Sequence, residues 1–194
     1  MWNEGMKGCL LVISGPSGVG KSTICRRLCE ELPAEFSVSW TTRSARPGER
    51  ENIDYRFVSE AEFESLKSAD GFAENAEVYG RRYGTPLAPL LRAISENRTI
   101  ILEIDINGAV QVRRRFPEAR LTFLLPPTPE EQARRITNRH TDSQEEIARR
   151  LAKADGEIRY AQETGVYDRF FINHDVETTV ADIQEWLASV ATVS

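Results

Sequence analysis

An eight-residue segment near the N-terminus, GPSGVGKS, restricts the fold of this chain more than any other feature. It matches the pattern G-x-x-x-x-G-K-[ST] from Gly15 to Ser22, follows an unbroken apolar run at residues 9–14, and leads into an amphipathic helical pattern at residues 21–32. Glycines permit a tight loop whose backbone N–H groups converge on an anion, and the helix N-terminus adds partial positive charge. This succession of buried strand, loop and helix predicts a site for the phosphates of a nucleotide.

The residue types in this loop indicate separate roles. Lys21 can reach the β- and γ-phosphates of a nucleoside triphosphate, and the Ser22 hydroxyl can ligate Mg²⁺. The predicted nucleotide-binding residues are the loop and the residue after it: Gly15, Pro16, Ser17, Gly18, Val19, Gly20, Lys21, Ser22 and Thr23. The loop by itself predicts nucleotide binding without specifying a reaction.

Apolar runs alternate with amphipathic segments along the rest of the chain, which is typical of an α/β fold with a parallel sheet. We expect strands at residues 9–14, 36–40, 99–104, 121–125 and 169–173. We expect helices at residues 21–32, 59–68, 86–97, 129–139, 143–164 and 177–188, and one more that follows the strand at 99–104 and ends near residue 115. Residues 72–85, rich in glycine and tyrosine, predict irregular structure.

Composition excludes several classes of protein. The chain has 194 residues, is 40% hydrophobic and 28% charged, and can bury a sizeable core without disulfides or metal. No apolar run approaches the ~20 residues of a membrane span, and the net charge of −5 argues against a protein that coats nucleic acid. The three cysteines, at positions 9, 25 and 29, form no metal-ligand cluster with histidine and predict reduced thiols in a cytoplasmic protein.

A second group of residues could bind another phosphate. Arg43 and Arg46 precede a Pro-Gly turn, and Tyr55 and Tyr83 supply hydroxyl donors on apolar rings. Guanidinium and phenol donors together could clamp a phosphomonoester from several sides. Taken alone, the segment could equally be a solvated charged loop. A kinase, however, needs a second anion site facing the first, and this segment offers one.

The motifs of this segment and of those that follow resemble the guanylate kinase family of P-loop nucleoside monophosphate kinases. They occur in the family's order and span essentially the whole chain: S-x-T-T-R-x-x-R-P-G-E from Ser39, D-Y-x-F-V-S from Asp54, F-x-E-x-A-E-V-x-G from Phe72, Y-G-T from Tyr83 and L-E-I-D-I-N-G from Leu102. The resemblance implies transfer of the γ-phosphoryl group of ATP to GMP or dGMP, with Mg²⁺ as cofactor. The implied partners are these small molecules, with no nucleic acid or membrane, in a cytoplasmic monomer or homo-oligomer.

The resemblance also implies a three-layer sandwich with a parallel sheet core, a GMP-binding insert and a helical lid. The implied core comprises residues 1–36, 98–127 and 156–194, the GMP-binding subdomain residues 37–97 and the lid residues 128–155.

By the same resemblance, each candidate site residue acquires a role. The GMP phosphate would be held by Arg43, Arg46, Tyr55 and Tyr83. Glu74 would accept hydrogen bonds from guanine N1–H and the 2-amino group, and the O6 edge would meet Ser39 and Thr85. Glu103 would help to place GMP, and Asp105 would support the water shell of Mg²⁺, although Asp105 could instead cap the following helix. Adenine lacks the two adjacent donors of guanine, so it would leave Glu74 unpaired.

Arginines in the implied lid would stabilise the charge that develops on the transferring phosphoryl group. These are Arg135, Arg139 and Arg150, which with Lys21 and Arg43 make up the predicted catalytic set. Without the resemblance, the same arginines would be read as solvated residues on helix surfaces. Asn173, after the last predicted strand, matches the family position near the adenine of ATP. No general base is expected, because the acceptor is a phosphate oxygen that is already largely deprotonated near neutral pH.

Two other functions remain compatible with parts of the pattern. One is a guanylate-kinase-like interaction module without catalysis, against which the intact Lys21, Ser22 and Asp105 argue. The other is a kinase for a different phosphorylated acceptor, such as a ribose phosphate. Glu74, Ser39 and Thr85 argue against that acceptor, because a sugar offers no guanine edge to recognise.

Overall fold

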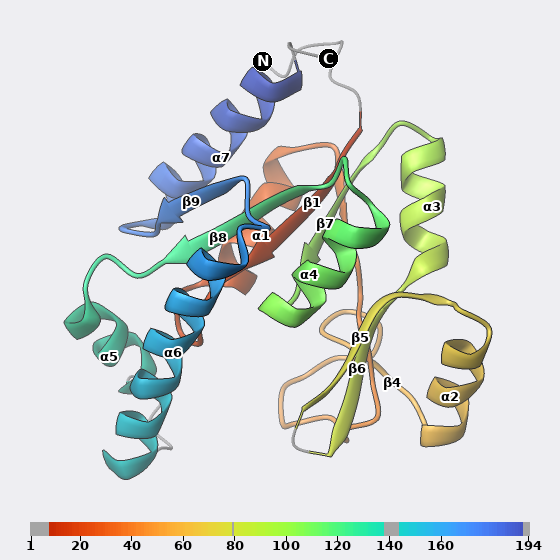
Figure 1. Ribbon diagram of the computed structural model, residues 1–194, viewed down its shortest axis with the longest axis horizontal. Helices are drawn as coiled ribbons and strands as arrows, with labels where there is room; N and C mark the ends of the chain where they lie inside the picture. Colours follow the sequence, from red (N-terminus) through yellow and green to blue (C-terminus); the bar gives the residue numbers. More distant parts are fainter. Residues whose placement is uncertain (1–7, 79, 138–143, 192–194) are drawn as a thin grey trace.

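A five-stranded parallel sheet forms the core of the protein in a computed structural model that describes residues 8–78, 80–137 and 144–191 (Figure 1). Its strand order is β2-β7-β1-β8-β9, and every neighbouring pair is parallel. The strands are β1 (Leu10–Ser14), β2 (Ala34–Phe36), β7 (Thr99–Glu103), β8 (Arg120–Leu125) and β9 (Arg169–Ile172). The apolar runs recognised in the sequence become the three central strands, which are buried on both faces.

Helices cover both faces of this sheet, and the alternation of side chains along β1 divides the core accordingly. Leu10 and Val12 pack towards α3 (Leu87–Ser95), α4 (Ile106–Arg115) and α6 (Gln144–Thr164). Leu11 and Ile13 pack on the opposite face towards α1 (Lys21–Glu31) and α7 (Val176–Ala191). The predicted three-layer α/β architecture is therefore confirmed. Among the described residues, no helix is both long and apolar enough to cross a bilayer.

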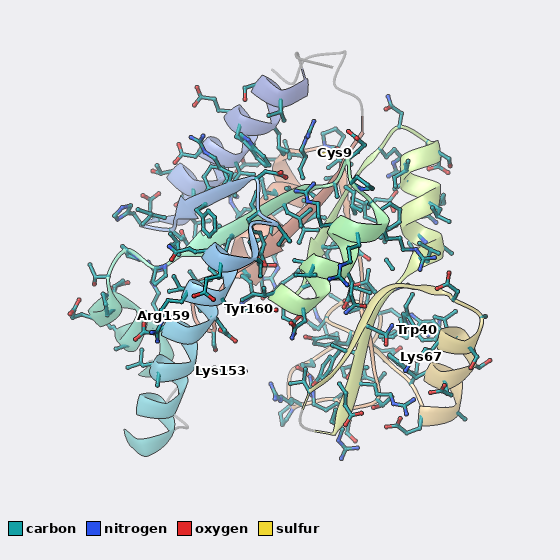
Figure 2. The ribbon with its side chains drawn as sticks, in the orientation of Figure 1. Cys9, Trp40, Lys67, Lys153, Arg159 and Tyr160 are labelled. Atoms are coloured by element: carbon teal, nitrogen blue, oxygen red, sulfur yellow. The ribbon has the colours of Figure 1, made fainter. Side chains whose placement is uncertain are left out.

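A second sheet of four strands, ordered β4-β3-β6-β5, lies beside the core with helix α2 (Glu60–Ser68) packed near it (Figure 1). Its strands are β3 (Trp40–Thr41), β4 (Arg56–Phe57), β5 (Phe72–Val78) and β6 (Arg81–Pro86). A capping box begins α2, with Ser59 and Glu62 each satisfying the other's backbone N–H. Figure 2 shows Trp40 of β3 on the side of this sheet that faces α2, where its ring meets Phe72 edge-on at 5.8 Å.

Three sequence predictions of local structure were wrong. Residues 72–85 are not irregular, because β5 and β6 form an antiparallel hairpin across them. The strand predicted at 36–40 is two strands: Phe36 ends β2 in the core, and the chain enters the second sheet at Trp40. Pro86 precedes α3 instead of starting it, because its extended backbone (φ −64°, ψ 136°) still pairs with Phe72.

The order of the strands positions the site. β1 lies between β7 and β8, and the loop that follows β1 leaves the sheet at its carboxyl edge, where open α/β sheets bind ligands. The second sheet lies on one side of this edge, and α5 (Pro129–Thr137) with the first half of α6 extends on the other (Figure 1).

Candidate active site

The phosphate loop adopts the conformation that its glycines predict. Gly20 has a left-handed backbone (φ 97°) immediately before α1 begins at Lys21, and a Cβ on Gly15 would lie only 2.8 Å from the carbonyl oxygen of Leu124. The Lys21 Nζ donates to the carbonyl oxygens of Gly15 and Pro16 at 2.7 and 3.1 Å. The lysine thus lies folded against its own loop, with its charge at the mouth of the anion site.

The end of β7 supplies two carboxylates beside this loop. Glu103 pairs with Ile13 in the sheet, and its Oε1 accepts a 2.9 Å hydrogen bond from the Ser22 hydroxyl. Asp105 accepts a 2.8 Å hydrogen bond from the Gly108 N–H and is the N-cap of α4. The helix-capping role considered for Asp105 is therefore real, and the same residue also lines the cavity described next.

One cavity of about 380 Å³ brings nine of the predicted site residues together. The phosphate loop with Lys21 and the second sheet both contribute to its lining. The predicted site residues that line it are Gly15, Ser17, Lys21, Ser39, Tyr55, Glu74, Tyr83, Glu103 and Asp105. Gly15 and Asp105, which are 90 positions apart in the chain, therefore share a single space with the groups expected to bind phosphate.

Glu74 is a buried carboxylate in the lining of this cavity. It belongs to β5 and is only 6% exposed, and its Oε1 accepts a 2.6 Å hydrogen bond from the Thr85 hydroxyl on β6. Burial raises the pKa of Glu74 to about 7, the hydrogen bond from Thr85 opposes that rise, and the nearby Asp105 adds to it. Gly108 keeps this space open, since a Cβ there would lie 2.8 Å from Glu74 Oε2.

Arg43 is held in place by a carboxylate to which the sequence interpretation gave no role. Glu49 accepts two hydrogen bonds from the Arg43 guanidinium, each 2.9 Å long, and a third of 2.7 Å from the Arg46 backbone N–H. The same guanidinium donates to the Tyr83 hydroxyl at 3.3 Å and lies 5.5 Å from the centre of the Tyr55 ring. Hydrogen bonding from Arg43 lowers the pKa of Glu49, so this ion pair persists at neutral pH.

Known proteins resemble this chain in sequence and in fold. The family model described as guanylate kinase matches residues 7–190. The chain belongs to the guanylate kinase family. It is 46% identical over 179 residues to a guanylate kinase of Thermus thermophilus, which covers 92% of this chain and 79% of the relative. It is 45% identical over 185 residues to that of Thermosynechococcus vestitus, covering 95% of both chains. The activity of the family is phosphoryl transfer from ATP to GMP.

A solved guanylate kinase agrees with the fold as well. The crystal structure of guanylate kinase from Anaplasma phagocytophilum superposes with a TM-score of 0.78 at 34% identity, covering 96% of this chain and 87% of that one. The predicted family, fold class and phosphotransferase activity are confirmed by these comparisons.

The structure places only one of the three arginines expected in the lid of a guanylate kinase. Arg135 on α5 donates to Glu131 Oε1 at 2.8 Å and to the carbonyl oxygen of His174 at 3.1 Å. Arg139 lies outside the described residues. Arg150 lies on α6, but its side chain is not among those described.

The remaining predicted residues differ in how they relate to the cavity. Arg46 has an exposed side chain, so only its backbone is tied to the Arg43–Glu49 pair. Asn173 is 2% exposed, and its side-chain amide donates to the Val19 carbonyl oxygen at 2.7 Å. Asn173 therefore lies against the outside of the phosphate loop.

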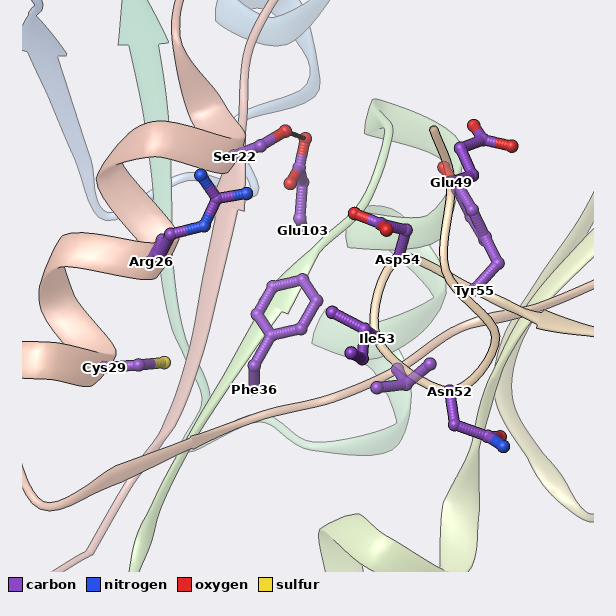
Figure 3. A pocket seen from close by; sticks show the side chains of 11 residues that line it. Ser22, Arg26, Cys29, Phe36, Glu49, Asn52, Ile53, Asp54, Tyr55 and Glu103 are labelled. Carbon is purple, nitrogen blue, oxygen red and sulfur yellow. Dashed lines mark hydrogen bonds between the residues drawn. The ribbon is translucent and has the colours of Figure 1, made fainter. Parts of the chain in front are cut away.

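A second cavity, of about 530 Å³, adjoins the first along α1 (Figure 3). Arg26 and Cys29 of α1 and Phe36 of β2 form one wall, and the loop that carries Ile53 and Asp54 forms the other. Ser22, Tyr55 and Glu103 line its inner end, so it opens onto the same guanylate kinase site.

Proposed function

We propose that this guanylate kinase phosphorylates GMP, and dGMP, by in-line transfer from ATP across the cavity between the phosphate loop and the second sheet. The observation that carries the proposal is that Lys21 and Glu74 line one and the same cavity. An anion site and a base-recognition group so placed fit a triphosphate donor and a nucleoside monophosphate acceptor that meet phosphate to phosphate.

The donor end uses backbone and side-chain charge together. The N–H groups of the loop and the N-terminus of α1 would surround the β-phosphate of ATP, since that end of a helix attracts anions. Lys21 would exchange the carbonyl oxygens of Gly15 and Pro16 for phosphate oxygens, because charge-assisted bonds to phosphate are stronger than bonds to neutral carbonyls.

The acceptor end would hold the GMP phosphate with Arg43, Tyr55 and Tyr83, which already contact one another. Glu49 fixes two donors of the Arg43 guanidinium and so presents the remaining edge in one orientation. Arg46, whose side chain is exposed, would reach the same phosphate from the solvent side. No general base is required, because the attacking phosphate oxygen is already largely deprotonated.

Glu74 would read the guanine base. A carboxylate offers two acceptors, and guanine offers two adjacent donors, N1–H and the 2-amino group. Ser39 lines the same cavity and Thr85 bonds to Glu74, so both lie where the O6 edge would be placed. Adenine would leave a buried charge without donors, which costs several kcal/mol.

The residues at the end of β7 fit a magnesium ion. The Ser22 hydroxyl and the nearby carboxylates of Glu103 and Asp105 are hard oxygen ligands, the type that Mg²⁺ prefers. Ser22 would bind the ion directly, and Asp105 would orient its water shell. The ion would neutralise charge on the ATP phosphates during transfer.

Residues of the lid complete the proposed catalytic set. Arg135, Arg139 and Arg150 would close over the transferring phosphoryl group and exclude water, with residues 128–155 as the lid and residues 37–97 as the GMP-binding subdomain. We expect the enzyme to act in the cytoplasm on free nucleotides, where both substrates are available.

Formation of ADP from ATP tests this function directly when the acceptor is varied. We expect GMP to be the best acceptor and dGMP to follow closely, with AMP, UMP and ribose phosphates negligible. A preference for AMP, or a ribose phosphate that rivals GMP, would refute the assigned acceptor. Absence of any phosphoryl transfer, with GMP still bound, would instead indicate a binding module.

A further inference from the structure

Two buried side chains hold the phosphate loop from its outer side. Asn173, just after β9, donates its Nδ2 to the Val19 carbonyl oxygen at 2.7 Å. Gln132 on α5 donates its Nε2 to the Ser17 carbonyl oxygen at 3.4 Å. Both side chains are only 2% exposed. Two carbonyl groups of the loop are therefore fixed by amides that come from distant parts of the chain.

The planarity of the peptide bond turns these contacts into a constraint on the anion site. In a trans peptide the C=O of one residue and the N–H of the next point in opposite directions. A Val19 carbonyl held on the outside of the loop directs the Gly20 N–H towards the inside. The Ser17 carbonyl likewise directs the Gly18 N–H inward. The donors that would meet phosphate are thus oriented by bonds on the opposite side of the loop.

Thr179 on α7 sets the orientation of the Asn173 amide. Its hydroxyl lies 3.0 Å from Asn173 Oδ1 and 2.8 Å from the Asp175 carbonyl oxygen, and these two acceptors share its one hydrogen. A hydroxyl donor on the Oδ1 side requires the amide NH₂ group to face Val19. Thr179 is 1% exposed, so water cannot readily replace this donor.

The Asn173 side chain packs closely against Gly20 of the phosphate loop. A Cβ on Gly20 would lie 2.7 Å from Asn173 Nδ2, and Gly20 also has the left-handed backbone that favours glycine. The amide therefore packs directly against the residue that precedes α1. A shift of Asn173 would be transmitted to the loop at the point where the helix N-terminus meets the phosphates.

We propose that Thr179 and Asn173 are positioning residues that hold the phosphate loop ready for the donor nucleotide, with Gln132 as a second anchor on α5. The two hydrogen bonds that join Thr179 to Asn173 and Asn173 to Val19 are called the relay below. The relay supports the loop on the side opposite the expected phosphates and does not require Asn173 to touch ATP. The inference rests on the proposed function in one respect, namely that the loop binds the phosphates of ATP. Because Gln132 lies on α5, the relay also links the loop to the helix that carries Arg135.

Steady-state kinetics of matched variants test this proposal. Asn173→Leu removes the donor at similar volume and should raise the KM for ATP about tenfold, the effect of losing one buried hydrogen bond. Thr179→Val should raise it about threefold, since the amide loses only its orienting partner. The KM for GMP should change less than twofold in both, because the acceptor site is separate. Thr179→Ser should restore the wild-type values.

Thr178→Val is the control, because Thr178 is exposed on the same turn of α7 and its hydroxyl bonds to Asp175, whereas the hydroxyl that bonds to Asn173 is that of Thr179. We expect the KM of Thr178→Val for ATP to match that of the wild type. This should hold even if Thr178→Val is as thermally unstable as Thr179→Val. Equal KM values for ATP in Thr179→Val and Thr178→Val would overturn the proposal. Parallel rises in the KM values for ATP and for GMP would overturn it as well. If Asn173→Leu does not fold, Thr179→Val and Gln132→Leu still decide the question.

Asn173→Asp supplies a readout that a purely structural role would not produce. Its carboxylate would face the Val19 carbonyl oxygen at the present 2.7 Å, whereas its protonated form could donate to it. Relative to the wild type at each pH, its KM for ATP should improve as the pH falls from 8 to 6. No relative improvement would contradict the proposal.

ATP titration separates this inference from the proposed function. If the wild type binds ATP but transfers no phosphoryl group to GMP, the proposed function fails, and the same variants compared by ATP dissociation constant still test the relay. If the wild type binds no ATP, the proposed function and the relay are both overturned. If ATP binds equally to the wild type, Asn173→Leu and Thr179→Val, only the relay is overturned.

Discussion

The Thr85 hydroxyl donates a 2.6 Å hydrogen bond to Glu74 Oε1, and the two residues face each other across the β5–β6 hairpin. Thr85 supplies only neutral donors, its hydroxyl and its backbone N–H, to a carboxylate that is only 6% exposed. A buried carboxylate normally needs several donors or a cation. In the proposed function, guanine would bring two further donors to this carboxylate.

The burial of Glu74 predicts that GMP binding depends on pH. Because burial raises the pKa of Glu74 to about 7, the free enzyme is largely protonated there at pH 6 and ionised at pH 8. In the proposed function guanine would require the ionised form, so the KM for GMP should rise about tenfold as the pH falls from 8 to 6. Binding near pH 6.5 should release a proton, which calorimetry in two buffers of different ionisation enthalpy measures.

The GMP phosphate also titrates, with a second pKa of about 6, so the pH profile needs a control. Glu74→Gln cannot ionise at this position and retains only the contribution of the phosphate. The excess pH dependence of the wild type over this variant belongs to Glu74. Identical profiles for the two proteins would show that Glu74 does not titrate in this range.

The same substitution should weaken base selection. Glu74→Gln offers guanine one acceptor and one donor in place of two acceptors, so an amide donor meets a donor of the base. We expect kcat/KM for GMP to fall by roughly 10²–10³-fold, while that for AMP stays level or rises. Initial rates with both acceptors give the ratio, and an unchanged preference for GMP would remove Glu74 from the specificity site.

The sequence patterns predict the core better than the acceptor side for a physical reason. Central strands such as β1 and β7 are continuous apolar runs, and the capping box at Ser59 is a local signal. The sequence pattern does not reveal β5, because a bulge between Phe72 and Glu74 disrupts the alternation of buried and exposed side chains. Phe72, Ala73 and Glu74 are all buried in succession. No period of two survives in such a strand.

The candidate active site likewise has parts that the sequence predicts and parts that it does not. The loop from Gly15 to Ser22 is contiguous in sequence, so its pattern alone predicts its chemistry. The role of Glu49 is not visible in that way, because its pairing with Arg43 depends on a turn that folds six residues back on themselves. The Asn173–Val19 bond joins residues 154 positions apart, which no local pattern reveals.

The Arg43–Glu49 pair predicts a selective loss of acceptor binding. Glu49→Gln keeps the shape of the side chain but weakens its two hydrogen bonds to the guanidinium, which frees Arg43 to rotate away from Tyr83. We expect the KM for GMP to rise about five- to tenfold, since a charge-assisted bond contributes more than a neutral one. The KM for ATP should stay constant, and a rise in both constants would contradict the assignment of this pair to the acceptor site.

Lys21 predicts the complementary result at the donor site. Lys21→Ala should reduce kcat by about 10³-fold, the scale for loss of one preorganised charge on the transferring phosphoryl group. GMP should still bind, as titration of the variant without ATP would show. Lys67→Ala is the control, because Lys67 is exposed on α2 (Figure 2) and does not line the cavity. A parallel loss of GMP binding in Lys21→Ala would mean that the two sites are not independent.

Inhibition by a dinucleotide that joins adenosine and guanosine through five phosphates tests the central claim most directly. If the phosphate loop and the Arg43 site face each other within one cavity, this molecule spans both of them. We predict inhibition that is competitive with ATP and also competitive with GMP, with affinity well above that of either nucleotide alone. Competition with only one of the two substrates would contradict the shared cavity on which the account depends.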